Sequence, residues 1–139
     1  MTLARRTLGN VPDERYTLTR AEMARSYHAW ALARVETVPA SEVASMLGCE
    51  VTELTRAGLI VLRDDSESLI PRFQLDADKH RVRATVAQAN RALMAERDPW
   101  GALAWWLSES PRWGHRRPID RPDDEQLVTL AGALDEDGF

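Results

Sequence analysis

Four of the five tryptophans stand between Trp100 and Trp113, and a basic run surrounds and follows the last of them. The members of this run are Arg112, His115, Arg116 and Arg117. Tryptophan and arginine are the residue types most enriched at the energetic centres of protein–protein interfaces. The composition of this segment therefore indicates contact with another macromolecule more than it indicates a chemical reaction.

The common catalytic and metal-binding motifs do not occur in the sequence. It contains no glycine-rich phosphate loop and no His-Glu-x-x-His pattern, and its histidines are not clustered with the single cysteine, Cys49. Neither Ser108 nor Ser110 has the flanking glycines of a nucleophile elbow. We therefore predict a protein that is not an enzyme and that needs no metal or other cofactor.

Charge and hydropathy limit the kinds of partner. The net charge is -4, whereas a protein held to DNA by its overall field is usually basic, so DNA could be contacted only through a local patch. The first fifteen residues lack the apolar run of a signal peptide, and no stretch approaches the roughly 20 apolar residues of a membrane span. These features predict a cytoplasmic protein.

The elements that position these residues are expected to be mainly helices. Residues 1–18 are polar and suggest a flexible N-terminal arm. Thr19 and Glu22 form the capping-box pattern at the start of an amphipathic helix that should end before Pro39. Helical spacing of apolar residues also predicts a helix over residues 77–96, which includes Val82 in its apolar stripe.

The segment from Ser41 to Ala57 has the pattern of a helix-turn-helix. Ser41 is a candidate N-cap for a helix that ends at Leu47, and Gly48 can supply its left-handed C-cap. A second short helix is expected over residues 51–57. Two apolar runs that follow, LIVLRDD and LIPRFQL, predict a two-stranded wing, and Pro71 suggests that its second strand is an edge strand.

The second helix would carry any DNA-reading residues, because this helix enters the major groove in a working helix-turn-helix. Its outward candidates, together with one wing residue, are Thr52, Thr55, Arg56 and Arg63. Glu50 and Glu53 oppose this role because they would lie near phosphates. DNA binding and a purely scaffolding or protein-docking role both stay open.

After the wing, the sequence predicts a small helical domain over residues 79–139, with a domain of residues 19–78 before it. Asp98-Pro99 should start one helix, and residues 124–136 should form the last one. Trp105 and Trp106 would point about 100° apart on a helix, so one ring could be buried in the chain and the other in a partner. Alternatively, both rings fill the core between three helices.

Several short motifs resemble, in their order, the Xre/MbcA/ParS-type antitoxins with an excisionase-like helix-turn-helix. The similarity covers residues 39–134. The matching residues are Ile70, Pro71, Phe73 and Gln74 in an apolar-Pro-x-aromatic-Gln segment, Trp106 and Leu107 at a helix end, and Trp113, Gly114, Arg116, Arg117, Pro118 and Asp120 in a turn. Trp113 stands where that family usually has leucine.

The resemblance implies that the C-terminal helices bind and neutralise a toxin, commonly of the RES type that consumes NAD, while the N-terminal part represses the operon. We expect a homodimer or a hetero-oligomer with the toxin. The predicted partner-binding residues are Trp105, Trp106, Trp113, Arg116 and Arg117. The alternative is a stand-alone transcriptional regulator or accessory protein without a toxin.

Overall fold

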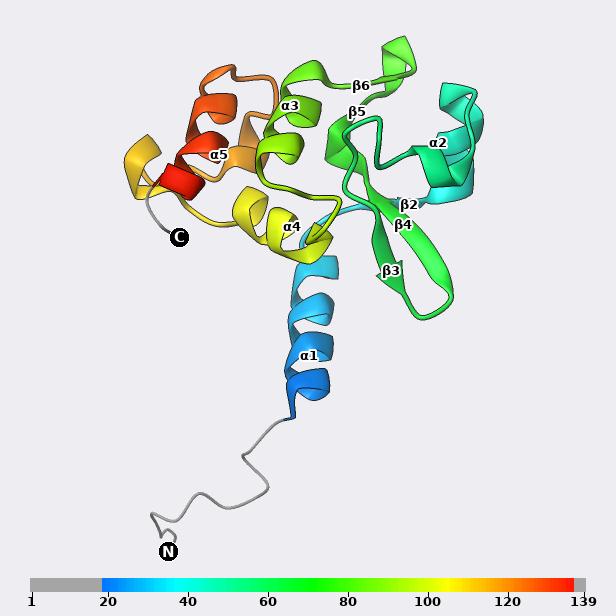
Figure 1. The fold of residues 1–139 in the computed structure, drawn as a ribbon, viewed down its shortest axis with the longest axis horizontal. Helices are drawn as coiled ribbons and strands as arrows, with labels where there is room; N and C mark the ends of the chain where they lie inside the picture. Colours follow the sequence, from blue (N-terminus) through cyan, green and yellow to red (C-terminus); the bar gives the residue numbers. More distant parts are fainter. Residues whose placement is uncertain (1–18, 137–139) are drawn as a thin grey trace, which may run out of the picture. The chain divides into compact units, whose positions relative to one another are not determined.

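The computed structural model describes residues 19–136, with side chains described as far as residue 133 (Figure 1). The predicted arm of residues 1–18 lies outside the described residues. The chain divides into two compact units, residues 1–30 and residues 31–139. Helix α1 (Arg20–Leu32) spans the boundary between these units.

The predicted capping box at the start of α1 is confirmed. The backbone N–H of Thr19 donates to Oε2 of Glu22 at 2.8 Å, and the backbone N–H of Glu22 donates to Oγ1 of Thr19 at 3.0 Å. The hydrogen bond from the Thr19 backbone, with that from its side chain and the charge of Arg25, lowers the pKa of Glu22. These bonds satisfy N–H groups that the first turn of a helix leaves without partners.

The helix-turn-helix segment differs from its prediction at both helices. Helix α2 (Ala40–Leu47) follows strand β2 (Thr37–Pro39) directly, so Pro39 is its N-cap and the prediction of Ser41 was wrong. Gly48 is the left-handed C-cap, with φ 72°, as predicted. The prediction of a second helix over residues 51–57 was also wrong, because only a single 3-10 turn, η2 (Val51–Glu53), forms there before irregular turns.

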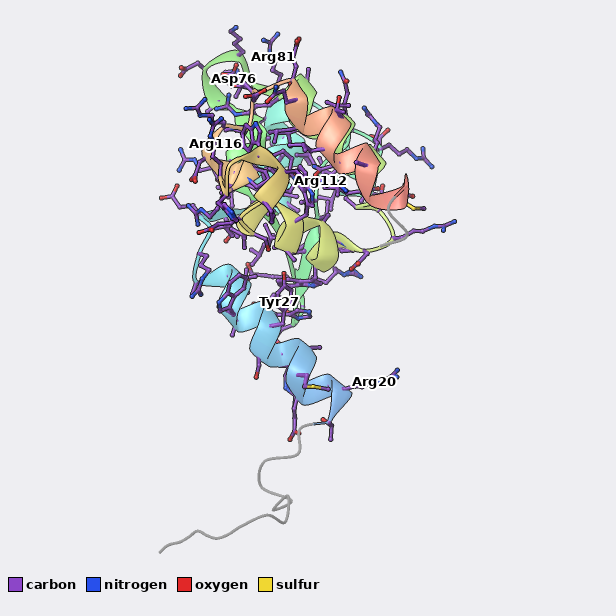
Figure 2. All side chains as sticks on the ribbon, turned by 90° about the vertical axis from the view of Figure 1, so that its left-hand side faces the viewer. Arg20, Tyr27, Asp76, Arg81, Arg112 and Arg116 are labelled. Atoms are coloured by element: carbon purple, nitrogen blue, oxygen red, sulfur yellow. The ribbon has the colours of Figure 1, made fainter. Side chains whose placement is uncertain are left out.

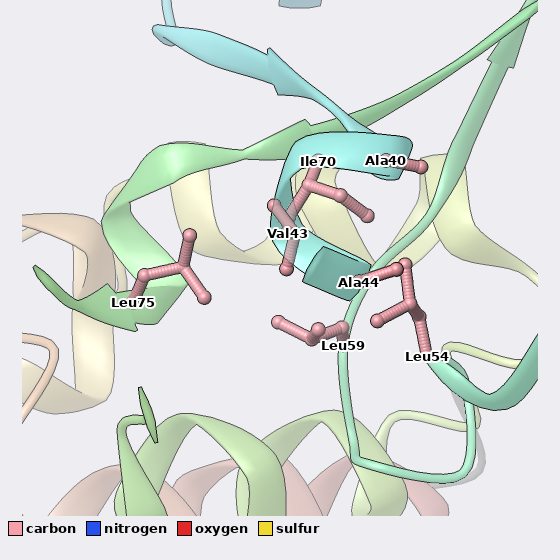
Figure 3. Packing of buried hydrophobic residues seen from close by; sticks show 7 residues of the cluster. All are labelled: Ala40, Val43, Ala44, Leu54, Leu59, Ile70 and Leu75. Carbon is pink, nitrogen blue, oxygen red and sulfur yellow. The ribbon is translucent and has the colours of Figure 1, made fainter. Parts of the chain in front are cut away.

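Packing in the core explains why η2 is shorter than the predicted helix. Gly58 takes φ +88° and ends the turns, and the chain then enters the core at Leu59. Leu54 and Leu59 are both buried against Val43 of α2 and Ile70, as Figure 3 shows. In a helix continued through residue 59, Leu54 and Leu59 would point about 140° apart, because each residue turns the helix by about 100°, so one of them would face away from this cluster.

The predicted wing is present and belongs to a three-stranded antiparallel sheet of order β2-β4-β3. Strand β3 (Leu62–Asp64) and strand β4 (Glu67–Pro71) form the hairpin, while β2 pairs with the other side of β4. The prediction that the strand with Pro71 is an edge strand was therefore wrong. Proline is tolerated because β3 pairing begins at Leu62 opposite Leu69, so Pro71 is paired only with Thr37 of β2.

An α-helix forms over only part of residues 77–96, where a continuous helix was predicted. Strands β5 (Leu75–Asp76) and β6 (Arg81–Val82) form a hairpin around the 3-10 turn η4 (Ala77–Lys79), and helix α3 spans Ala84–Ala92. His80 adopts φ 50° after the turn, which a continuing helix could not include. Pairing of Leu75 with Val82 instead packs Val82 against the cluster of Figure 3.

The remaining helices follow the predictions more closely. Helix α4 (Pro99–Leu107) has Asp98 as its N-cap, whose Oδ1 accepts from the Gly101 N–H at 3.0 Å. Two 3-10 turns, η5 (Pro111–Trp113) and η6 (Pro118–Asp120), lead to helix α5 (Gln126–Glu136), which packs alongside α3 (Figure 1).

Over residues 19–136 the fold is therefore mixed α/β, with five α-helices and small antiparallel sheets. The prediction of a mainly helical fold was too narrow, because the sequence periodicity did not reveal β2 or the hairpin of β5 and β6. None of the helices in this part of the chain is long and apolar enough to cross a membrane.

Candidate protein-binding surface

The adjacent Trp105 and Trp106 of α4 occupy different environments. Trp106 is completely buried, and its indole Nε1 donates to Oδ1 of Asn90 at 2.8 Å. Trp105 is only partly buried, and its ring meets that of Trp106 edge-on with centroids 5.1 Å apart. A completely buried ring has no area left for a partner, so Trp106 is a core residue and Trp105 carries the exposed indole area of this pair.

A surface hollow of about 530 Å³ lies beside Trp105. Ala104 and Pro111 give it apolar area, and Arg112 and Glu109 place opposite charges on it. The complete lining is Gly101, Ala104, Trp105, Ser108, Glu109, Ser110, Pro111 and Arg112. We call this feature the Trp105 hollow. Its chemistry suits an apolar anchor from a protein partner, with polar groups at the edge.

The turn after the Trp105 hollow is fixed by backbone hydrogen bonds. The N–H of Ser110 donates to the Arg116 carbonyl at 2.9 Å, and the His115 N–H donates to the Ser110 carbonyl at 2.8 Å. Gly114 and His115 both adopt positive φ, of 67° and 58°, to close this loop. Figure 2 shows Arg112 and Arg116 on the part of the molecule that carries this turn.

Trp113 and Arg116 contact each other within this turn. Trp113 is 7% exposed, and its Nε1 donates to Oε1 of Gln126 in α5 at 2.7 Å. The guanidinium carbon of exposed Arg116 lies 5.3 Å from the centre of the Trp113 ring, in cation–π contact. Trp113 thus supports Arg116, whose guanidinium stays accessible.

Arg117 has an internal partner. Its Nη2 lies 2.9 Å from Oδ1 of Asp120, and its Nε lies 3.2 Å from Oδ2. This two-bond pair with Asp120 raises the pKa of Arg117. Of the five residues predicted for a partner, Trp106 and Trp113 are buried, whereas Trp105, Arg116 and Arg117 keep exposed area, and Asp120 holds the guanidinium of Arg117.

A buried polar network, which sequence reasoning missed, connects α4 to the earlier half of the chain. The amide nitrogen Nδ2 of Asn90 donates to the Gly58 carbonyl at 2.7 Å and to Oε1 of Gln74 at 2.9 Å. Gln74 accepts from the Ile60 N–H at 2.7 Å and donates to the Ile60 carbonyl at 3.1 Å, as a neighbouring strand would. Both amide side chains are essentially unexposed, with every polar atom paired.

The predicted DNA-binding residues are not gathered on one helix face. Thr52 and Arg56 are exposed and Thr55 is partly buried around η2, whereas Arg63 lies on β3 opposite Ser68. Carboxylates flank both places. Glu53 accepts from the Glu50 N–H at 2.8 Å at the start of η2, and Asp64, Asp65 and Glu67 stand at the tip of the wing.

The structure does bring Thr55 and Arg56 together with residues that sequence reasoning missed. They border a cavity of about 540 Å³ to which Arg91 and Arg97, from α3 and the turn after it, also contribute. Their separation of 35 and more positions along the chain explains why no local motif indicated this arrangement. Among residues 19–136, no group of histidine, cysteine, aspartate and glutamate side chains is arranged to hold a metal ion.

Comparisons with known proteins find no matching protein-family model, no matching curated protein and no matching solved structure. The resemblance to the Xre/MbcA/ParS-type antitoxins therefore stays a prediction from sequence motifs.

Proposed function

We propose that the chain is an antitoxin-like protein that binds a protein partner through the surface formed by Trp105, the Trp105 hollow and Arg116. The observation that carries this proposal is the unequal placement of the two adjacent indoles. Trp106 is completely buried and anchors α4 in the core through its hydrogen bond to Asn90. Trp105 keeps exposed area beside a hollow with apolar walls.

The chemistry of the surface defines the kind of partner segment. An apolar side chain can enter the hollow, because Trp105, Ala104 and Pro111 offer carbon surface there. An acidic side chain next to that anchor can pair with Arg116, whose guanidinium is exposed. Partly buried aromatic rings beside arginines are the usual energetic centres of such contacts.

The test begins with affinity capture by the full chain from an extract of its native cells. The captured protein is then produced alone and together with this chain. An antitoxin role predicts that the captured protein alone stops growth of a host cell and that the full chain restores growth.

Two variants connect this result to the proposed surface. Trp105→Ala should weaken binding of the captured protein about 30-fold, the loss typical of an interface centre. Arg116→Glu should weaken it through charge reversal. Val51→Ala is the matched control, since Val51 is an exposed apolar residue on η2, 39% accessible, outside the surface. Unchanged affinity of both variants, with unfolding transitions like that of the parent chain, rejects the proposal.

Operator binding remains a second candidate function. It is favoured by one observation, namely that Thr55 and Arg56 share a cavity with two further arginines. The carboxylates near η2 and at the tip of the wing oppose a deep approach of DNA to those elements.

A further inference from the structure

The cavity beside Thr55 and Arg56 has an unusual balance of charge for this acidic protein. Gly58, Leu59, Asn90 and Ala95 are its buried lining residues, and the exposed charged residues around it are Arg56, Arg91, Glu96 and Arg97. The lining thus includes three arginines and one glutamate in a chain whose net charge is -4. We call this feature the arginine cavity.

Two arginines that line another hollow have acidic partners. In the hollow of about 450 Å³ near β5, Arg72 lies 3.9 Å from Glu36, and Arg83 lies 2.8 Å from Asp123. Nε of Arg81 likewise lies 4.0 Å from Oδ2 of Asp76, and both residues are labelled in Figure 2. In the part of the chain that the structure describes, Arg56, Arg91 and Arg97 form no salt bridge.

The arginine cavity is also fixed in shape. Nη2 of Arg91 donates to the Arg56 carbonyl at 3.1 Å, which ties α3 to the turns after η2. The Asn90 amide holds the Gly58 carbonyl at 2.7 Å behind this contact. After α3, Met94 adopts φ 58°, and its carbonyl accepts from the Arg97 N–H at 2.9 Å, so the turn that carries Arg97 is ordered by its own bonds.

We propose that the arginine cavity binds a phosphate group. A guanidinium matches two phosphate oxygens through parallel N–H donors, and the Thr55 hydroxyl can donate a further hydrogen bond. Asn90 lines the cavity but already uses both N–H donors internally, so the arginines and Thr55 are the available ligands. The phosphate can belong to the backbone of duplex DNA or to a small phosphate compound, since both present the same oxygens.

The site does not depend on the Trp105 hollow, so either proposal can fail without the other. The experiment is a titration of the isotopically labelled full chain, followed by NMR at low ionic strength. The probes are inorganic phosphate, ATP and a duplex DNA of about 20 base pairs, a length that covers one or two protein footprints. Binding at the cavity should shift the backbone signals of Gly58, Leu59 and Ala95 and the side-chain amide of Asn90.

Variants decide which groups hold the probe. Arg97→Gln and Arg56→Gln should each weaken binding about tenfold, whereas Arg121→Gln, the same change on an exposed arginine outside the cavity, should leave it unchanged. Glu96→Gln should strengthen binding, because it removes the one carboxylate of the lining. The proposal is overturned if Arg97→Gln and Arg121→Gln lose affinity equally. It is also overturned if none of the three probes shifts the NMR signals of the cavity residues.

The source of the phosphate follows from the same titrations. Two results together assign the site to a nucleic-acid backbone. Duplex DNA binds with higher affinity than ATP, and in Arg97→Gln the slope of log binding constant against log salt concentration becomes shallower by about one unit. Tighter saturable binding of ATP or inorganic phosphate assigns it to a small phosphate compound. Both results support a phosphate site.

Discussion

At the scale of single residues, two amide side chains decide how the interior is joined. Gln74 bonds both the N–H and the carbonyl of Ile60, and Asn90 joins Gln74, Gly58 and the Trp106 indole. Buried polar groups are favourable only when their hydrogen bonds are complete, because each unpaired group retains its cost of desolvation. This network therefore ties four segments together at specific atoms rather than by general hydrophobic contact.

The first prediction concerns Asn90. Asn90→Leu keeps the number and branching of the side-chain heavy atoms but leaves the Trp106 N–H and the Gly58 carbonyl unpaired in the core. It should lower the free energy of unfolding by about 3 kcal/mol, as expected for two buried unsatisfied groups. Urea unfolding followed by circular dichroism measures the change, and Gln88→Leu on the exposed side of α3 is the control. If Asn90→Leu lowers the free energy of unfolding no more than Gln88→Leu does, the hydrogen bonds of the network do not stabilise the fold.

At the scale of elements, close approach between a turn and a helix determines where the chain bends. Gly58 is buried against α3 with φ +88°, and a Cβ added there would lie 2.6 Å from the Ala87 Cβ and 2.8 Å from its Cα. The same glycine ends the turns that follow η2. Thr55 and Arg56 thus lie in the turns that border the arginine cavity instead of on the predicted short helix of residues 51–57.

The second prediction compares two left-handed glycines. Gly58→Ala should destabilise the protein by about 3 kcal/mol, because the positive φ and the contact with α3 both oppose a side chain. Gly48→Ala should cost only about 1 kcal/mol, since Gly48 has φ +72° but nothing within 4 Å of an added Cβ. Thermal and urea unfolding of both variants tests the difference.

A double variant separates the contact of Gly58 with the Ala87 methyl group from its other two constraints, the backbone strain and the contact with the Ala87 backbone. Adding Ala87→Gly to Gly58→Ala should not restore stability, because the Ala87 backbone atoms remain within 3.1 Å of the added carbon. Full recovery in the double variant would mean that only the Ala87 methyl group opposes the substitution.

At the scale of the whole molecule, residues 31–139 form one compact unit, although the sequence suggests a boundary near residue 78. Hydrogen bonds from Asn90 and Gln74 cross that position, and β6 adds Val82 to the cluster around α2. The proposed partner surface on α4 and the arginine cavity are thus parts of the same unit. Trp106 and Asn90 lie between them, since Asn90 lines the cavity and bonds the residue next to Trp105.

The third prediction follows because the Asn90 and Gln74 network joins these parts into one compact unit. The indole N–H of Trp106 and the backbone N–H of Ile60, which are bonded to Asn90 and Gln74, should exchange with solvent through one common opening. Native-state hydrogen exchange should give both protons the same opening free energy and the same dependence on denaturant. The Glu22 amide in the exposed cap of α1 should exchange with a lower opening free energy. Clearly different opening energies for Trp106 and Ile60 would indicate two independently unfolding parts.

The sequence by itself determined the features that depend on neighbouring residues. The Thr19–Glu22 capping box, the Gly48 C-cap, the Asp98-Pro99 helix start and the wing hairpin were all predictable, because turn, cap and hairpin chemistry act over a few positions. The sequence left open whether one or both rings of the Trp105 and Trp106 pair are buried, and the structure buries Trp106 completely and Trp105 in part.

Only the tertiary structure decided the features that depend on distant residues. Strand β2 was invisible because it forms by pairing with β4, more than 25 positions away, and Pro71 is tolerated only through the offset of β3. The arginine cavity likewise needs the turn at Gly58 to meet the end of α3. Long-range pairing and close packing select among local conformations of similar energy, so local propensity cannot specify them.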